Sequence, residues 1–372
     1  MKRIGIFAFY DEQGIVDEFK QYLLESMIPY LSELVIVING AIQEDALRKW
    51  KETYRYVFVR ENMGYDSGAY KDVLLGKYAE IDWGEWDEII LFNDTFYGPL
   101  FSWDEMFRTM ENMDVDFWGL IRDPEKMAKR PDCSNMAVEE HIQSYFLAIK
   151  KNMFISKFWN IFWKELEYPT VYWEAVERFE YAFTPYFVKR GFQFATWLDI
   201  CGGEKYIKRG IITYMVAGYD IVKECRFPII KWRVMSPSFY KNMTALLEYV
   251  EHETDYDKML ILKHLERMEN RIRPFSMARL EEFVGNRDKV YVFGRGTYGK
   301  GLEDCFRAKG WNWGGFVVSN PKNEDEIGVY DLNLDEEDGI VVALNEGNAN
   351  EVRTLLESRF SSAQILYPVG YN

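Results

Sequence analysis

A continuous apolar run meets an abrupt polar turn in EIILFNDTFYGPL, residues 88–100. The run Ile89–Phe92 is too short for a helix but long enough for a strand that is buried on both faces. Asn93 and Asp94 end the run, and Gly98-Pro99 continues the turn. We therefore predict an interior strand of a parallel sheet with an acidic side chain at its carboxyl end.

Strand and helix patterns alternate before this segment. Apolar runs predict further strands at residues 4–10, 34–38 and 56–59, and apolar residues at helical spacing separate them. Alternating units of this kind form a mostly parallel sheet with helices on both faces, which makes the fold class α/β. Because ligands of such sheets bind beyond the carboxyl ends of the strands, we expect the site at the loops after Tyr10, Val59 and Phe92.

The 372-residue chain is predicted to divide into an α/β domain at 1–240, a charged helical connector at 241–285 and a small α/β module at 286–372. In the last module, Gly294-x-Gly296-x-x-Gly299 lies between a strand and a helix, as in dinucleotide-binding folds. The acidic residue that would bind the ribose is missing about 20 residues later. We interpret the glycines as a tight turn in a Rossmann-like module.

Composition excludes several classes of function. The chain holds 45 basic and 60 acidic residues, a net charge of −15, so it is a poor binder of nucleic acid. Its four cysteines have no C-x-x-C spacing, which argues against zinc fingers and is typical of reduced thiols in the cytosol. No apolar run approaches the roughly 18 residues of a membrane span.

Two loops at the predicted sheet edge carry polar side chains. The loop ENMGYDSGAY (residues 61–70) precedes a helix expected at 69–78, a position that favours an anionic ligand. Asp66 there is suited to a ribose, a sugar hydroxyl or a metal; the alternative is a capped turn in which Asp66 or Ser67 is the N-cap of the helix. Asp94 is suited to Mg²⁺ or Mn²⁺ beside a diphosphate, or it forms a turn with Asn93.

Four segments in order, ENMGYDSGAYKDVL, LFNDTFYGPL, VDFWGL and HIQSYFLAIKK, resemble the rhamnan synthesis protein F family. The resemblance covers residues 1–240. It implies a GT-A-like fold and a glycosyltransferase (a hexosyltransferase, chiefly rhamnosyltransferase) of bacterial cell-surface polysaccharide assembly. A dTDP- or UDP-activated donor is then expected at Asn62, Gly64, Asp66, Asn93 and Asp94. Asp94 is the implied metal ligand, although Asn93-Asp94-Thr95 keeps one carboxylate where many GT-A enzymes have Asp-x-Asp.

The resemblance also implies a carboxylate base for an inverting reaction. Such a base often lies about eleven residues before a glycine that precedes a strand. Glu180 is eleven positions before Gly191 and is the predicted base, with Glu177 one turn earlier in reserve. His141 and Gln143 are predicted to face the acceptor. The alternative for Glu177 and Glu180 is that both are solvated carboxylates on a helix. The alternative for His141 and Gln143 is that they are the solvent-facing residues of a half-buried strand.

Further expectations concern charge, partners and location. Lys129 and Arg130 are expected to offset the donor charge. The aromatic stripe of residues 154–163 fits a membrane surface or, as we favour, a core-facing helix. His252 and His264 are expected on the surface. The predicted partners are a nucleotide-sugar donor and a glycan or lipid-linked acceptor, in the cytoplasm or at the inner face of the plasma membrane. The alternative functions are an NAD-dependent enzyme that modifies sugar nucleotides and a non-catalytic scaffold.

Overall fold

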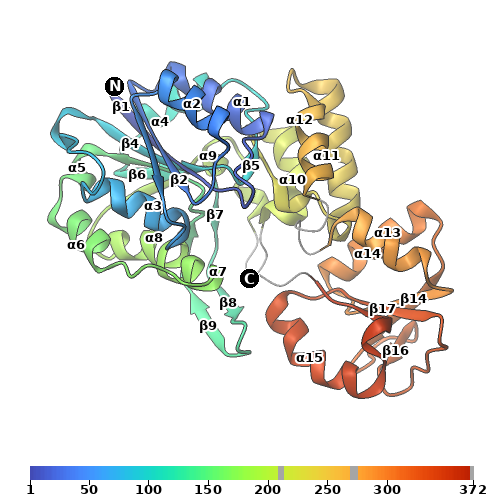
Figure 1. The fold of residues 1–372 in the computed structure, drawn as a ribbon. Helices are drawn as coiled ribbons and strands as arrows, with labels where there is room; N and C mark the ends of the chain where they lie inside the picture. The colour runs from blue at the N-terminus through green and yellow to red at the C-terminus, as the bar shows by residue number, and fades with distance from the viewer. Residues whose placement is uncertain (208–212, 269–274, 369–372) are drawn as a thin grey trace.

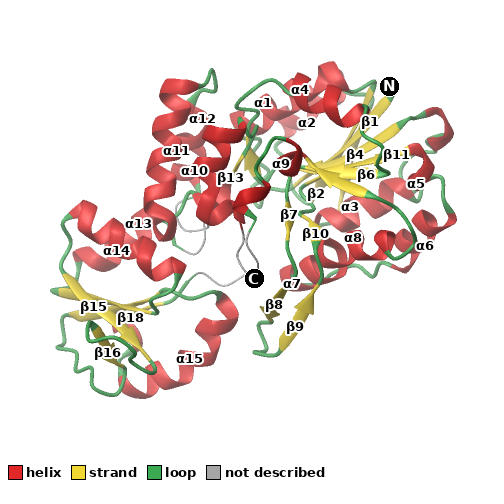
Figure 2. Ribbon diagram, turned by 180° about the vertical axis from the view of Figure 1, so that it is seen from behind, coloured by secondary structure: helices red, strands yellow, loops and turns green. Residues whose placement is uncertain are grey.

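The computed structural model describes residues 1–207, 213–268 and 275–368 (Figure 1). It contains a large α/β unit built on one mixed sheet, a group of helices beside that unit, and a smaller α/β unit at the carboxyl end (Figures 1 and 2). The α/β fold class predicted from the alternating patterns is confirmed.

The central sheet has seven strands. Their order is β12 (Phe194–Thr196), β6 (Phe117–Gly119), β11 (Phe146–Lys150), β4 (Glu88–Asn93), β1 (Arg3–Phe9), β2 (Glu33–Asn39) and β3 (Tyr56–Arg60). Strand β11 runs antiparallel to both of its neighbours, and the other pairs are parallel. Every residue of β1 and β4 is buried, as the continuous apolar runs predict. Because β1 and β4 pair in parallel, their carboxyl ends are adjacent.

Helices cover both faces of this sheet. The first half of the chain contributes α1 (Glu18–Met27), α2 (Glu44–Thr53), α3 (Tyr65–Leu74) and α4 (Asp104–Glu111), and the following part contributes α5 (Lys151–Phe154), α6 (Lys157–Glu165), α7 (Tyr172–Ala175) and α8 (Tyr181–Val188). Helix α3 begins four residues before the predicted start, because Gly64 has a φ of 81° and turns the chain directly into the helix.

The aromatic stripe of α6 faces the protein interior. Trp159, Phe162 and Trp163 are buried in the same hydrophobic cluster as Ile6 of β1. This confirms the core-facing interpretation and leaves those three rings unavailable to a membrane. No helix within the described ranges is both long and apolar enough to cross a bilayer.

The helices expected as a connector share a core with the sheet. They comprise α11 (Tyr240–Glu253) and α12 (Lys258–Arg267), beside α9 (Trp197–Ile200) and α10 (Thr213–Cys225). Leu246 and Ile261 belong to the same hydrophobic cluster as Phe92 of β4. The surface prediction for His264 is wrong: it is 3% exposed, and its Nδ1 lies 2.7 Å from the Tyr97 hydroxyl.

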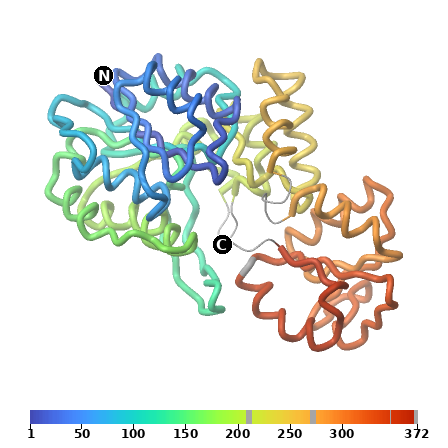
Figure 3. The backbone as a smooth tube through the Cα atoms, in the orientation of Figure 1, coloured from blue at the N-terminus to red at the C-terminus, as the bar shows by residue number. Residues whose placement is uncertain are grey.

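Three short strand pairs flank the sheet. They are β5 (Phe96–Tyr97) with β13 (Ile230–Lys231), β7 (Arg122–Asp123) with β10 (His141–Ile142), and β8 (Lys126–Lys129) with β9 (Asn135–Val138). The β8–β9 pair forms a hairpin that projects toward the carboxyl-terminal unit (Figure 3). There Lys129 forms an ion pair with Glu351 of α15.

The carboxyl-terminal unit is a separate parallel sheet in the order β16-β15-β14-β17-β18. Its elements are α13 (Met277–Gly285), β14 (Lys289–Phe293), α14 (Thr297–Lys309), β15 (Trp313–Val318), β16 (Glu326–Gly328), β17 (Asp338–Val342), α15 (Glu346–Arg359) and β18 (Ile365–Leu366). Strand β16 was not predicted, because it lies in an acidic stretch. A Cβ at Gly299 would lie 1.9 Å from the Gly294 carbonyl oxygen, so the glycines make a tight turn.

Candidate active site

The two predicted donor loops meet through one side chain, Asn93. Its amide Nδ2 donates to Asp66 Oδ2 at 2.9 Å. Its Oδ1 accepts from the Thr95 amide at 3.2 Å and from the Thr95 hydroxyl at 2.8 Å. The turn after β4 is therefore an Asx turn in which Asn93 also holds the carboxylate at the start of α3. Burial raises the pKa of Asp66, although Asn93 and the Ser67 amide oppose the shift.

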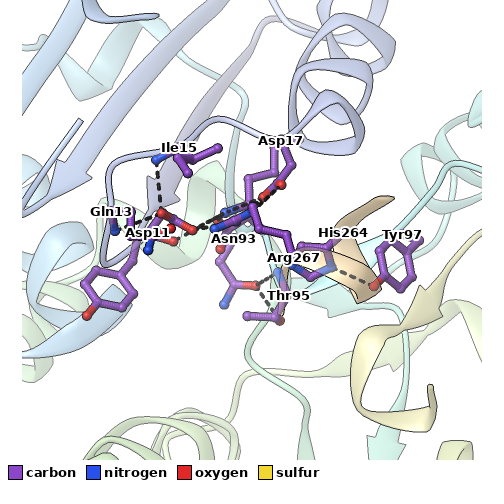
Figure 4. A network of polar contacts seen from close by, with 12 residues as sticks. Asp11, Gln13, Ile15, Asp17, Asn93, Thr95, Tyr97, His264 and Arg267 are labelled. Carbon is purple, nitrogen blue, oxygen red and sulfur yellow. Dashed lines mark hydrogen bonds and ion pairs between the residues drawn. The ribbon is translucent and has the colours of Figure 1, made fainter. Parts of the chain in front are cut away.

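Asp94 faces a buried network of charges. Its Oδ2 lies 2.8 Å from the Lys20 ammonium, and the two side chains are 9% and 5% exposed. The ammonium also lies 3.7 Å from Asp17 and 4.0 Å from Asp11. Arg267 of α12 pairs with both Asp11 and Asp17, and so ties α12 to the loop after β1 (Figure 4). Burial raises the pKa of Asp94 although Lys20 lowers it.

The residues at the end of β4 do not fit the divalent cation that the resemblance implies. Asp94 is the single carboxylate of the motif, and an ammonium already occupies its Oδ2. A metal ion there would lie beside a like charge, which is unfavourable. The described residues contain no group of three or more His, Cys, Asp or Glu side chains that could hold a metal ion.

A lysine that the sequence interpretation missed lies beside this turn. Strand β13 pairs with β5 so that Lys231 is opposite Phe96, and its Nζ donates to Thr95 Oγ1 at 2.5 Å. The ammonium is also 3.8 Å from the centroid of the Tyr145 ring. Burial lowers the pKa of Lys231 to about 7, while the nearby carboxylates oppose the shift. The one local signal was a lysine inside the otherwise apolar Ile229–Trp232.

Glu180 is the predicted base, and one of its oxygens is fixed by the chain. Its Oε2 accepts hydrogen bonds from Ser144, at 3.0 Å from the amide and 2.8 Å from the hydroxyl. Burial alone would raise the pKa of Glu180, but His141, the Ser144 hydrogen bonds and Lys231 outweigh it and lower the pKa. Glu180 ends a π-helical turn, Val176–Glu180, a feature common at functional sites.

The reserve base lies in a different environment. Glu177 accepts from Arg130 Nε at 3.1 Å and from Arg130 Nη2 at 2.6 Å. Arg130 and Lys129, which the sequence predicts to offset the donor charge, each form an ion pair, with Glu177 and Glu351 respectively. Glu177 is consequently a matched neighbour of Glu180 that is already neutralised.

His141 and Gln143 are buried and turn toward an aspartate. Gln143 Nε2 donates to Asp123 Oδ1 at 3.0 Å, and Lys126 donates to the other oxygen at 2.9 Å. His141 Nδ1 lies 2.8 Å from the Glu139 carbonyl oxygen, and its Nε2 is 3.9 Å from Asp123. Asp123, which the sequence interpretation missed, therefore organises the segment that carries Ser144.

The other two predicted donor residues lie at the start of α3. Asn62 is exposed, and Gly64 precedes the first helical residue. A Cβ at Gly64 would lie 2.6 Å from Tyr168 Cδ1, so the Tyr168 ring leaves no room for a side chain. The positive φ of Gly64 also favours glycine.

Several solved structures resemble this fold at low sequence identity. The structure resembles a Desulfovibrio desulfuricans G20 protein assigned as a nucleotide-diphospho-sugar transferase (11% identity, 71% of this chain and 99% of that one, TM-score 0.33). It also resembles a Pyrobaculum calidifontis mannosyltransferase, PcManGT, solved with GDP-Man and Mn²⁺ (11% identity, 71% of this chain and 74% of that one, TM-score 0.32). A third similar structure is S. aureus TarS 1–349 (10% identity, 83% of this chain and 92% of that one, TM-score 0.31). Scores this low carry no argument about function. No curated protein sequence matches the chain.

The sequence profile of rhamnan synthesis protein F matches residues 34–294. The match begins at β2 and extends beyond the predicted limit of residue 240, through α11 and α12 to the end of β14. The chain belongs to the rhamnan synthesis protein F family, which confirms the family and the glycosyltransferase class that the four sequence segments imply.

Proposed function

We propose that the protein is an inverting glycosyltransferase that moves a sugar, of the rhamnosyl kind, from a dTDP- or UDP-activated donor to a growing cell-surface glycan or lipid-linked acceptor. The observation that carries this proposal is a carboxylate near the donor loops, that of Glu180, which is held in place by two hydrogen bonds from Ser144. Membership of the rhamnan synthesis protein F family supports the polysaccharide role. The cytoplasm, where nucleotide sugars are made, is the proposed location.

Glu180 has the features of a general base. Within the described part of the chain, both hydrogen bonds to its carboxylate go to Oε2, so Oε1 remains to accept a proton. Its lowered pKa keeps it ionised near neutral pH. In the proposed step, the acceptor hydroxyl gives its proton to Oε1 as its oxygen bonds to the anomeric carbon. The bond from that carbon to the diphosphate breaks, and its electron pair leaves with the diphosphate oxygen.

The donor is proposed to lie across the loops after β1, β3 and β4. Asp66, oriented by Asn93, is suited to accept hydrogen bonds from ribose or sugar hydroxyls. Asn62 and Gly64 would line the entrance. His141 and Gln143 are proposed to act indirectly, since their contacts with Glu139 and Asp123 position the segment that holds Glu180 through Ser144.

The test is Glu180→Gln with Glu177→Gln as the matched control. Gln keeps the size of the side chain and cannot take a proton, so transfer should fall by about 10²–10⁴-fold. Affinity for UDP or dTDP should stay close to that of the wild type. Glu177→Gln should keep transfer, because Arg130 already neutralises that carboxylate.

Transfer would be followed as release of nucleotide diphosphate from a panel of UDP- and dTDP-sugars with glycan acceptors. Equal transfer by all three proteins would remove Glu180 from the mechanism. Greater sensitivity at Glu177 would place the base one turn earlier.

A further inference from the structure

We propose that the Lys231 ammonium, instead of a divalent cation, offsets the negative charge of the donor diphosphate. This inference rests on the proposed function and names the residue that performs one part of it. Its starting point is the misfit at β4, where the carboxylate expected to hold a metal is paired with Lys20. A diphosphate at this edge therefore needs another source of positive charge.

The position of Lys231 is suited to this role. Its Nζ is bonded to Thr95 Oγ1, and the same hydroxyl donates to Asn93 Oδ1. Asn93 in turn donates to Asp66. This chain of hydrogen bonds joins the ammonium to both donor loops. Lys231 also interacts electrostatically with Glu180, so it lies near the predicted base as well as the donor loops.

The ammonium of Lys231 has unused hydrogen-bonding capacity. A lysine has three N–H donors, and one hydroxyl is the sole hydrogen-bond acceptor that the described residues supply to it. Within that part of the chain it also forms no ion pair, in contrast to Lys20. The carboxylates of Glu180, Asp66 and Asp94 act on this ammonium without forming an ion pair with it. A partly buried ammonium with no anion in direct contact is unfavourable, and a phosphate would provide that contact and the missing acceptors.

The role requires no proton transfer by Lys231. As the bond to the anomeric carbon breaks, its electron pair remains on the diphosphate oxygen, and the ammonium stabilises that charge while keeping its own proton. Burial holds the pKa of the free Lys231 at about 7, and a bound diphosphate would raise it, so the ligand itself keeps the side chain charged.

The experiment titrates UDP, dTDP, UMP and dTMP into the full-length protein by calorimetry, once with EDTA and once with Mn²⁺ or Mg²⁺. Wild-type protein should bind the diphosphates in EDTA. Lys231→Met should weaken diphosphate binding by about ten- to a hundredfold and change monophosphate binding much less. Lys231→Arg should retain most of the affinity. Lys223→Met, which removes an exposed lysine of α10, is the charge-matched control.

Two results would overturn the inference. One is diphosphate binding by the wild type that appears only with Mn²⁺ or Mg²⁺, a result that does not depend on any variant folding. The other is unchanged diphosphate affinity in a folded Lys231→Met protein. Either would leave the proposed function in place. Binding of no nucleotide under any condition would instead overturn the proposed function and this inference together.

Discussion

The ion pair between Asp94 and Lys20 should make Asp94→Ala chiefly a stability variant. Removal of the carboxylate leaves an ammonium that is 5% exposed without its partner at 2.8 Å. Removing one member of a buried ion pair typically costs about 3–5 kcal/mol of unfolding free energy. Asp17 at 3.7 Å and Asp11 at 4.0 Å still face Lys20, so we expect the lower end, about 3 kcal/mol.

The reciprocal change should cost less. In Lys20→Met, Asp94 loses its cation, but burial already raises its pKa, and protonation can remove the unpaired charge. In the double variant neither charge is left alone. Its loss of stability should be smaller than the sum of the two single losses by about 0.5–3 kcal/mol.

The assay is urea unfolding of the wild type and the three variants, followed by tryptophan fluorescence and far-UV circular dichroism, with UDP affinity measured on the same samples. Coincident transitions would justify a two-state free energy. Additive losses in the cycle would show that the pair is not coupled. An Asp94→Ala protein that unfolds like the wild type, yet loses diphosphate binding in Mn²⁺, would return Asp94 to the role of metal ligand and refute the reasoning.

Three further outcomes are expected. Asp66→Asn should weaken UDP binding by about tenfold, as expected for a lost charge-assisted hydrogen bond, with little change in melting temperature; unchanged affinity would exclude Asp66 from the donor site. UDP affinity should fall as pH rises above about 7, because Lys231 then loses its positive charge; the charged groups that face it are Glu180, Asp66, Asp94 and Arg233. A Lys231→Arg protein should not show this fall. If its UDP affinity declines in the same way, another group causes the pH dependence. A chain of residues 1–268 should bind UDP like the full chain, because the predicted donor residues lie before α13, whose Leu280 packs with the carboxyl-terminal sheet; a folded but non-binding protein would show that this unit contributes to the site.

Local patterns in the sequence were sufficient for the fold class and for the juxtaposition of Asp66 and Asn93 at one edge of the sheet. Apolar runs such as Ile89–Phe92 report burial on both faces, and their alternation with helical spacing reports parallel strands. The four matching segments identified the family. Short elements were harder to predict: the β8–β9 hairpin and β16 lie in polar stretches, where pairing with a neighbouring strand outweighs weak local preference.

The partners of the charged side chains were decided by tertiary structure alone. Lys20 and Asp94 are 74 positions apart, and Lys231 is 136 positions from Thr95, so no local pattern reports either contact. The sequence by itself determined that a carboxylate ends β4 and that a glutamate precedes Gly191. Packing of α1 against β5, just after the Asp94 turn, determined that this carboxylate is neutralised by the Lys20 ammonium. Pairing of β13 with β5 determined that a second ammonium, that of Lys231, lies near Glu180. The physical reason is that charge interactions depend on distance through space and on burial, which separation along the chain does not reveal.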